Sequence, residues 1–146
     1  QLFLGITFNW GIVMAWAALN NTISFEIIAL YISAIFWTLG YDTIYGAQDM
    51  SDDEIIGLKS TSIKFKKKMK LFVSISYFIT SMVIVYLFKN NIGFNIFSIL
   101  LFFFISSLII QLFKFSEHQP ETCLNTFKLN NYSGLLLFLS IFLIDL

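Results

Sequence analysis

The stretch IGFNIFSILLFFFISSLIIQLF (residues 92–113) contains no charged residue and is long enough to cross a lipid bilayer as a helix. A membrane helix needs about 20 consecutive, mostly apolar residues. The stretch lacks the alternation of apolar and polar residues that is typical of a strand in a membrane barrel. It therefore predicts a transmembrane helix.

Similar stretches recur along the chain. The chain is 58% hydrophobic and 12% charged, with a mean hydropathy of +0.80, whereas soluble domains are about 45–50% apolar and about 25% charged. The sequence therefore predicts an all-α integral membrane fold with about five transmembrane helices. The solid apolar run of the last one, 135–144, is too short to span, so this helix must begin near residue 126 or remain a half-span. We place the helices over residues 2–19, 23–45, 71–88, 92–113 and, more weakly, 126–144.

Several features of the composition reduce the number of functions that the chain could have. The net charge is +0, so no overall basicity indicates a nucleic-acid partner, and the single cysteine, Cys123, excludes an intrachain disulfide and is expected to be structural. His118 has no acidic neighbours at metal-ligand spacing and is expected to be solvated, and Asp145 is expected at the membrane interface. The chain opens in an apolar run without an initiator Met or a signal-peptide pattern, so we expect a longer protein.

The lysines predict the orientation in the membrane, because cytoplasmic loops of membrane proteins carry an excess of basic residues. If all five helices span, eight lysines lie on one side and only Lys89 lies on the other. The rule places the acidic segment 41–60 and the basic run KFKKKMK (64–70) in the cytoplasm, or in the matrix of a mitochondrion. The eight are Lys59, Lys64, Lys66, Lys67, Lys68, Lys70, Lys114 and Lys128.

Five of the nine acidic residues lie in YDTIYGAQDMSDDEIIGLKS (41–60). On a continuous helix Asp42, Asp49 and Asp53, spaced i, i+7 and i+11, would fall within roughly 40° of one another. Like charges so close repel each other, and hard carboxylate oxygens suit Mg²⁺, which binds one or two carboxylates together with substrate phosphates. The stripe therefore predicts a Mg²⁺-bridged phosphate site, with a plain charged cap at the membrane boundary as the alternative.

Other residues are candidates for substrate contacts. Asn9 is a polar residue in the middle of a predicted helix, which indicates either a cavity-lining role or helix packing. Tyr45 lies one turn before Asp49, and Lys59 follows the acids closely enough to reach a diphosphate, although an ordinary interfacial lysine is the alternative. The remaining acids of the segment, Asp52 and Glu54, point away from the stripe and are expected to be solvated.

The segment YDTIYGAQDMSDDEIIGLKSTSIKF (41–65) resembles the second aspartate-rich motif of the UbiA superfamily of intramembrane prenyltransferases. It is most similar to the form YDxxYAxQDxxDDxxxGxxS of the 4-hydroxybenzoate polyprenyltransferases, with Gly46 in place of alanine. Segments 5–18 and 120–138 are also similar to parts of these enzymes. The family has nine membrane helices and a first motif, N-D-x-x-D-x-x-x-D, that does not occur in this sequence. Residues 1–146 are therefore expected to be a single membrane domain, the C-terminal part of such an enzyme.

The resemblance implies prenyl transfer from a polyprenyl diphosphate to an aromatic acceptor, 4-hydroxybenzoate, in ubiquinone biosynthesis. It implies that Asp49 and Asp53 are the catalytic acids and hold Mg²⁺ through the diphosphate, with Asp42, Tyr45, Lys59 and Asn9 as substrate-binding residues. The expected partners are these two substrates and the lipid bilayer, and no nucleic acid. The expected location is the bacterial inner membrane or the mitochondrial inner membrane. With one acidic cluster of two, this part alone is expected to be inactive.

Other functions remain open at the level of sequence. Haem-type or chlorophyll-type acceptors are alternatives within the same family. The CDP-alcohol phosphotransferases require a D-G-x-x-A-R segment, and this chain contains no arginine. A cation-transport subunit would place acids near the membrane midplane on broken helices, whereas these acids crowd one membrane end.

Overall fold

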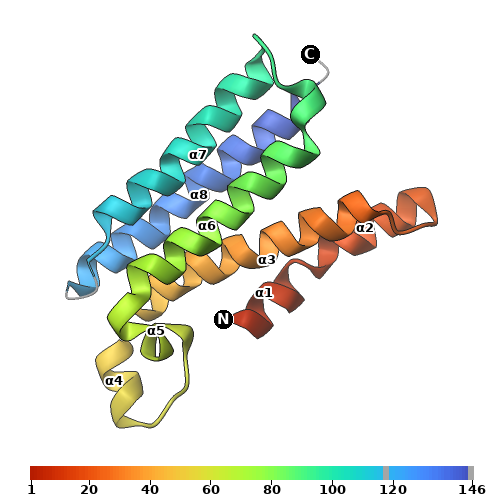
Figure 1. Ribbon diagram of the computed structural model, residues 1–146. Coiled ribbons are helices and arrows are strands. Elements are labelled where there is room, and N and C mark those ends of the chain that lie inside the picture. Colours follow the sequence, from red (N-terminus) through yellow and green to blue (C-terminus); the bar gives the residue numbers. More distant parts are fainter. Residues whose placement is uncertain (117–118, 145–146) are drawn as a thin grey trace.

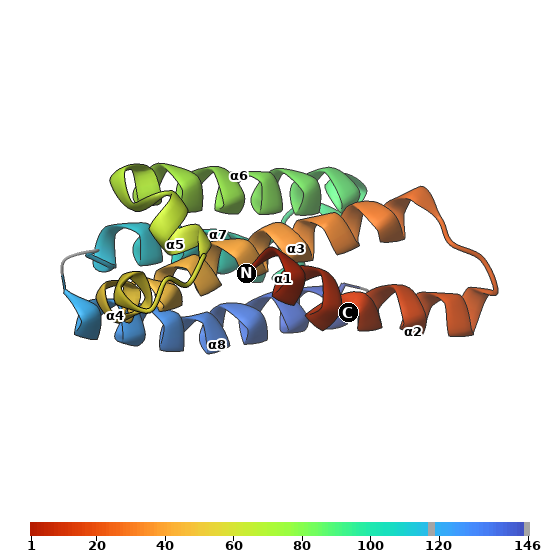
Figure 2. The same ribbon diagram turned by 90° about the horizontal axis from the view of Figure 1, so that it is seen from below.

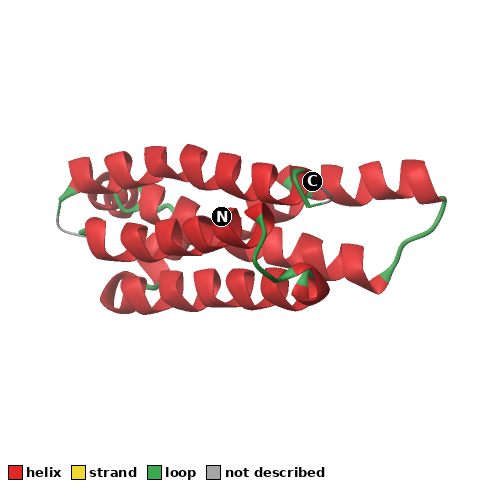
Figure 3. Ribbon diagram, turned by 90° about the horizontal axis from the view of Figure 1, so that it is seen from above, coloured by secondary structure: helices red, strands yellow, loops and turns green. Residues whose placement is uncertain are grey.

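The computed structural model describes residues 1–116 and 119–144, and within these ranges the chain is helical and contains no strand (Figures 1 and 3). His118 and Asp145 lie outside the described residues. The elements are α1 (Leu2–Phe8), α2 (Trp10–Asn20), α3 (Phe25–Gly46), α4 (Met50–Ile55), α5 (Thr61–Lys64), η1 (Lys66–Lys68), α6 (Met69–Leu87), η2 (Lys89–Asn91), α7 (Ile96–Lys114) and α8 (Pro120–Phe142).

The predicted all-α membrane fold is confirmed, with one difference in the number of spans. Among the described residues, four helical segments are long and apolar enough to cross a membrane: Leu2–Asn20, Phe25–Gly46, Lys66–Leu87 and Ile96–Lys114. The fifth predicted span, α8, has 23 residues, which at about 1.5 Å per residue exceeds the roughly 30 Å of a bilayer core. It begins before residue 126 and has a lower apolar content, because its first half carries asparagines and Lys128.

The first predicted span, 2–19, is confirmed as a membrane-length segment, but a break at Asn9 divides it into two helices. Asn9 has φ −88° and ψ 0° and separates α1 from α2. Its side chain explains the break, because Nδ2 donates to the carbonyl oxygen of Gly5 at 2.8 Å and to Thr38 Oγ1 of α3 at 2.8 Å. The amide thus compensates for disturbed backbone bonding at the break and ties it to the neighbouring helix.

One end of the bundle gathers the acidic and basic segments. Figures 1 and 2 place α4, α5 and the start of α6 at the end where α3 terminates, and α7 ends and α8 begins at the same end. The α6–α7 turn lies at the opposite end (Figure 1). Lys128, one of the eight lysines counted on this side, lies in the first half of α8.

The helix ends follow local chemistry. Ser24 caps α3, its Oγ accepting from Ile27 N at 3.4 Å, with Glu26 in the first turn. Asn95 caps α7 in the same way, its Oδ1 accepting from Ser98 N at 2.9 Å. Each cap satisfies one of the backbone donors that a helix start leaves unpaired.

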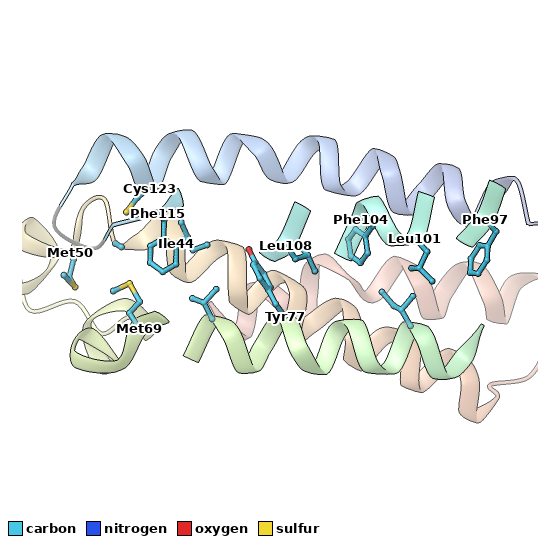
Figure 4. Packing of buried hydrophobic residues seen from close by; sticks show 13 residues of the cluster. Ile44, Met50, Met69, Tyr77, Phe97, Leu101, Phe104, Leu108, Phe115 and Cys123 are labelled. Carbon is cyan, nitrogen blue, oxygen red and sulfur yellow. The ribbon is translucent and has the colours of Figure 1, made fainter. Parts of the chain in front are cut away.

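The core lies between α3, α6, α7 and α8 (Figure 4). Tyr77 crosses it, 2% exposed, and its hydroxyl donates to Gln111 Oε1 at 2.6 Å. Gln111 Nε2 donates to Ser133 Oγ at 2.9 Å, and Ser133 Oγ lies 2.8 Å from Ser107 Oγ. This chain of polar groups joins α6, α7 and α8. Cys123 is fully buried, with Sγ 3.3 Å from the carbonyl oxygen of Ser116.

Candidate functional site

The site begins where α3 stops, at Gly46. A Cβ on Gly46 would lie 2.6 Å from Ser62 Oγ and 2.9 Å from Gln1 Nε2, so α5 and the chain start approach this backbone closely. Ser62 Oγ is held in place because it donates to the carbonyl oxygen of Thr43 at 2.9 Å. The glycine that replaces the alanine of the family pattern is therefore matched to this packing.

Asp49 directly precedes the short helix α4, and Asp53 lies within it. Asp49 stands at the N-cap position, and the N–H of Asp53 donates to the carbonyl oxygen of Asp49 at 2.9 Å, so the two residues are one helical turn apart. Asp49 is exposed and Asp53 is partly buried. The i, i+4 pair predicted from the sequence is confirmed, and its like charges lie on neighbouring positions of one face.

The glycine after α4 closes the helix. Gly57 has φ +75°, a left-handed conformation that glycine adopts without steric cost. Leu58 N donates to the carbonyl oxygen of Asp53 at 2.9 Å, and Gly57 N donates to that of Glu54 at 3.3 Å, the two bonds of a Schellman motif. Lys66 Nζ forms an ion pair with Glu54 Oε2 at 2.7 Å, so Glu54 is paired and not simply solvated.

The predicted stripe of three acids is wrong as a feature of one helix. The helix is interrupted over residues 47–49, so the angular arithmetic that aligned Asp42 with Asp49 and Asp53 does not apply across the gap. Asp42 remains in the last turns of α3, partly buried. In the described part of the chain, no group of three or more His, Cys, Asp or Glu residues is placed to hold a metal ion. The acidic site is therefore a pair on α4.

The interrupted segment also contains a buried polar atom, Gln48 Oε1, that could not be identified from the sequence. Gln48 stands directly before Asp49, and its Oε1 is buried without a hydrogen-bond partner among the described residues. A buried acceptor left unpaired costs about 1–3 kcal/mol. An oxygen of this kind beside a carboxylate pair suits a cation or a donor group that arrives with a ligand.

Hydrogen bonds hold segment 58–64 against α3 and against Gln1, which precedes α1. Ser60 caps α5, and Thr61 Oγ1 lies 2.7 Å from Thr43 Oγ1. Thr61 N donates to Gln1 Oε1 at 2.9 Å. Lys59 lies in this segment and is exposed. It lines a hollow of about 420 Å³ together with Gln1, Leu58 and Lys64, and no acidic residue of α4 lines this hollow.

Asn9 lines a different cavity, deeper in the bundle. This cavity measures about 430 Å³ and is also lined by Trp37, Thr38, Tyr41 and Phe127. An adjoining, more apolar hollow of about 310 Å³ shares Asn9 and Trp37 with it. Asn9 thus combines the two predicted roles, because it packs against α3 and also borders a cavity.

An aromatic series connects this cavity with the end of α3. Trp37 and Tyr41 have ring centroids 6.3 Å apart, Tyr41 and Phe127 5.9 Å, and Phe127 and Tyr45 4.7 Å. Tyr45 therefore packs on α8, and no hydrogen bond joins its hydroxyl to a described aspartate. Trp37 Nε1 donates to Asn130 Oδ1 at 2.9 Å.

Phe127 and Asn130 line this cavity but were not predicted from the sequence to do so. Nothing distinguishes Phe127 among 18 phenylalanines, whereas the adjacent polar pair of Asn130 and Asn131 inside a membrane-length helix was a usable signal.

Comparisons with known proteins match nearly the whole chain, including the segment that contains Asp49 and Asp53. The model of the UbiA prenyltransferase family matches residues 1–142. The chain is 37% identical to the mitochondrial 4-hydroxybenzoate polyprenyltransferase of Homo sapiens over 98% of its length, which is 39% of that protein. It is 36% identical to the 4-hydroxybenzoate octaprenyltransferase of Vibrio vulnificus over 97% of its length, which is 50% of that protein. The chain thus spans half or less of these relatives. No solved structure gives a significant match.

Proposed function

Because the chain belongs to the UbiA prenyltransferase family, we propose that it supplies one side of the site at which a polyprenyl diphosphate donates its prenyl group to 4-hydroxybenzoate, a step of ubiquinone biosynthesis. The observation that carries the proposal is the Asp49–Asp53 pair, one turn apart on α4 at the membrane end of α3. Residues 1–146 then form one membrane domain of a larger enzyme, since the relatives are at least twice as long.

The chemistry of the residues fits a magnesium ion bound together with a diphosphate. Mg²⁺ prefers oxygen ligands and typically uses one or two carboxylates plus phosphate oxygens and water. Asp49 and Asp53 provide two carboxylates, and Gln48 provides a buried oxygen that has no hydrogen-bond partner within residues 1–116 and 119–144. Bound there, the ion would neutralise negative charge on the leaving diphosphate. The other contacts to the substrates would be made by side chains of the protein.

The reaction breaks the bond between the allylic carbon and the diphosphate oxygen, and the aromatic ring forms a carbon–carbon bond ortho to its hydroxyl and then loses a proton. The carboxylates of Asp49 and Asp53 would hold the ion to which the departing diphosphate binds at the membrane boundary. Lys59 is close to them in the sequence and is a candidate cation for the same diphosphate, although it lines a separate hollow in this structure. Water would quench the allylic cation, so the reacting carbon must lie in a dry place.

The cavity between α1, α3 and α8 suits the apolar part of the substrates. Its walls combine aromatic rings with Asn9 and Asn130, so it offers apolar surface and a few polar contacts for an aromatic acceptor. Aromatic faces stabilise a nearby cation, and Tyr41 and Phe127 are the rings closest to the end of α3 in this wall.

Purified full-length protein tests the proposal directly. We expect it to convert a polyprenyl diphosphate and 4-hydroxybenzoate into prenylated product with Mg²⁺ and to stop when the ion is chelated. Release of diphosphate with a haem or chlorophyll precursor, and none with 4-hydroxybenzoate, would reassign the acceptor. Cation flux through reconstituted vesicles without diphosphate release would contradict an enzymatic role.

A further inference from the structure

Lysines crowd the connection between α4 and α6, and the structure arranges four of them around a hollow. This hollow measures about 370 Å³ and is lined by Ile63, Lys64, Phe65, Lys66, Lys67 and Lys68; we call it the lysine hollow. Its four lysines are exposed, whereas Ile63 and Phe65 are partly buried. It therefore combines a concave cationic surface with two apolar walls.

The lysine hollow is held in shape. The hydroxyls of Thr61 and Ser62 anchor α5 to Thr43, and the Phe65 ring stacks on Phe72 of α6 at 4.2 Å with an interplanar angle of 10°. The concave surface thus joins two parts of the bundle and does not depend on a free loop.

Most of the positive charge in the hollow lacks a counter-ion. Among the described residues the only ion pair is that of Lys66 with Glu54. Lys64, Lys67 and Lys68 form no ion pair there, and Lys64 Nζ lies 5.6 Å from the centroid of the Phe65 ring. Three neighbouring cations without carboxylates attract an anion strongly where the membrane lowers the local dielectric constant.

The surroundings of the hollow indicate which anion this is. The membrane-length segment Lys66–Leu87 starts in the hollow, so the hollow lies at the level of the lipid headgroups. Nearby on the same end of the bundle, Ile55, Ile56 and Leu58 are 83%, 71% and 53% exposed. A soluble anion would neutralise the lysines and leave these aliphatic side chains in water, whereas a lipid surface accommodates both.

We propose that the lysine hollow binds the phosphate headgroup of an anionic phospholipid, with Ile55, Ile56 and Leu58 resting on the adjoining lipid interface. Neither Asp49 nor Asp53 lines the hollow, and the proposal does not depend on prenyl transfer. It anchors the segment that follows the aspartates to the membrane surface. Phosphatidylglycerol has the required chemistry, one phosphate charge and two acyl chains. Phosphatidylcholine is its zwitterionic counterpart, because its phosphate charge is balanced by the choline cation.

Energy transfer from tryptophan to a pyrene-labelled acyl chain measures the binding. Full-length protein in an uncharged detergent is titrated with pyrene-labelled phosphatidylglycerol or phosphatidylcholine. We expect preferential binding of phosphatidylglycerol that weakens as salt rises. In the variant Lys64→Gln/Lys67→Gln/Lys68→Gln the preference should fall on the order of 100-fold, or about fivefold per lysine.

Two control variants separate position from total charge. Lys89→Gln/Lys114→Gln/Lys128→Gln removes the same charge elsewhere and should keep the preference, as should Lys64→Arg/Lys67→Arg/Lys68→Arg. If the glutamine variant does not insert, the salt titration of the unmodified protein decides, because a preference that salt does not reduce contradicts the proposal. Prenyl transfer, assayed in parallel, reports on the proposed function separately.

Four results would overturn the proposal. Equal binding of both lipids would show no anion recognition. Undiminished preference in the glutamine variant would place the site elsewhere. Displacement of the lipid by inorganic phosphate or a short DNA duplex at comparable concentration would indicate a general anion surface. Stoichiometric displacement by a polyprenyl diphosphate would assign the hollow to the substrate site.

Discussion

At the scale of single residues, glycines set how closely the helices approach. A Cβ on Gly40 would lie 2.3 Å from Cε1 and 2.6 Å from Cδ1 of Tyr77, so the ring of Tyr77 occupies the space that the glycine leaves. The ring has little freedom to withdraw, because its hydroxyl is bonded to Gln111. Small residues at such contacts let membrane helices pack tightly.

Replacing Gly40 should therefore destabilise the bundle. We expect Gly40→Ala to cost about 1–3 kcal/mol through overpacking, more than the higher helix propensity of alanine returns. Gly11→Ala is the matched control, because no heavy atom lies within 4 Å of a Cβ at Gly11 and the variant should be neutral or stabilising. Thermal unfolding of both variants in detergent measures the difference, and equal stability of the two would refute the packing account.

Single residues also show where sequence reasoning reaches its limit. The Asp49–Asp53 pair depends on neighbours within one helical turn, and its spacing was predicted. The unpaired oxygen of Gln48 and the ring of Phe127 depend on elements far away in the sequence. Spacing alone cannot place such groups.

At the scale of elements, the break between α3 and α4 decides the geometry of the acids. The predicted range 23–45 ends one residue before the observed end of α3 at Gly46, but the stripe of three acids assumed a helix that continues beyond this point. The break at Asn9 was not predicted, since its stabilising partner Thr38 lies on another helix. Local sequence patterns therefore located the helices and missed their interruptions.

The polar chain across α6, α7 and α8 gives a prediction about helix packing. Tyr77→Phe removes the bond to Gln111 and leaves that buried carbonyl oxygen unpaired, which should cost about 1 kcal/mol. Tyr86→Phe is the control, since the Tyr86 side chain is 59% exposed and its hydroxyl makes no hydrogen bond to a described residue. Thermal unfolding compares the two variants, and a loss no greater than that of the control would mean that the network contributes nothing.

At the scale of the whole molecule, the lysine distribution predicts a definite orientation. In a Cys123→Ser background, cysteines introduced at Ser51, on α4, and at Asn90, in the α6–α7 turn, should be labelled from opposite sides of the membrane. Ser51 should react from the cytoplasmic or matrix side. Labelling of both positions from the same side would contradict an odd number of crossings between them.

The architecture of the whole chain was the most predictable feature. Long apolar runs are sufficient to predict membrane helices, because the bilayer imposes both their length and their hydrogen bonding. The weaker α8 required tertiary information, since its polar residues pair with α3 and α7 through Asn130 and Ser133. Asn9 was predicted as a possible lining residue of a cavity, but the other walls of that cavity could not be predicted, because three separate elements form it.

The central claim is that the pair on α4, and not the acidity of the segment as a whole, holds the diphosphate. Prenyl transfer by full-length Asp49→Asn, Asp53→Asn and Asp52→Asn variants tests it most directly, since each removes one charge without removing volume. Asp52 is exposed and adjacent to Asp53, so it is the matched control. We predict losses on the order of 100-fold or more for Asp49→Asn and Asp53→Asn and a far smaller loss for Asp52→Asn. Similar, mild losses in all three variants would contradict the account.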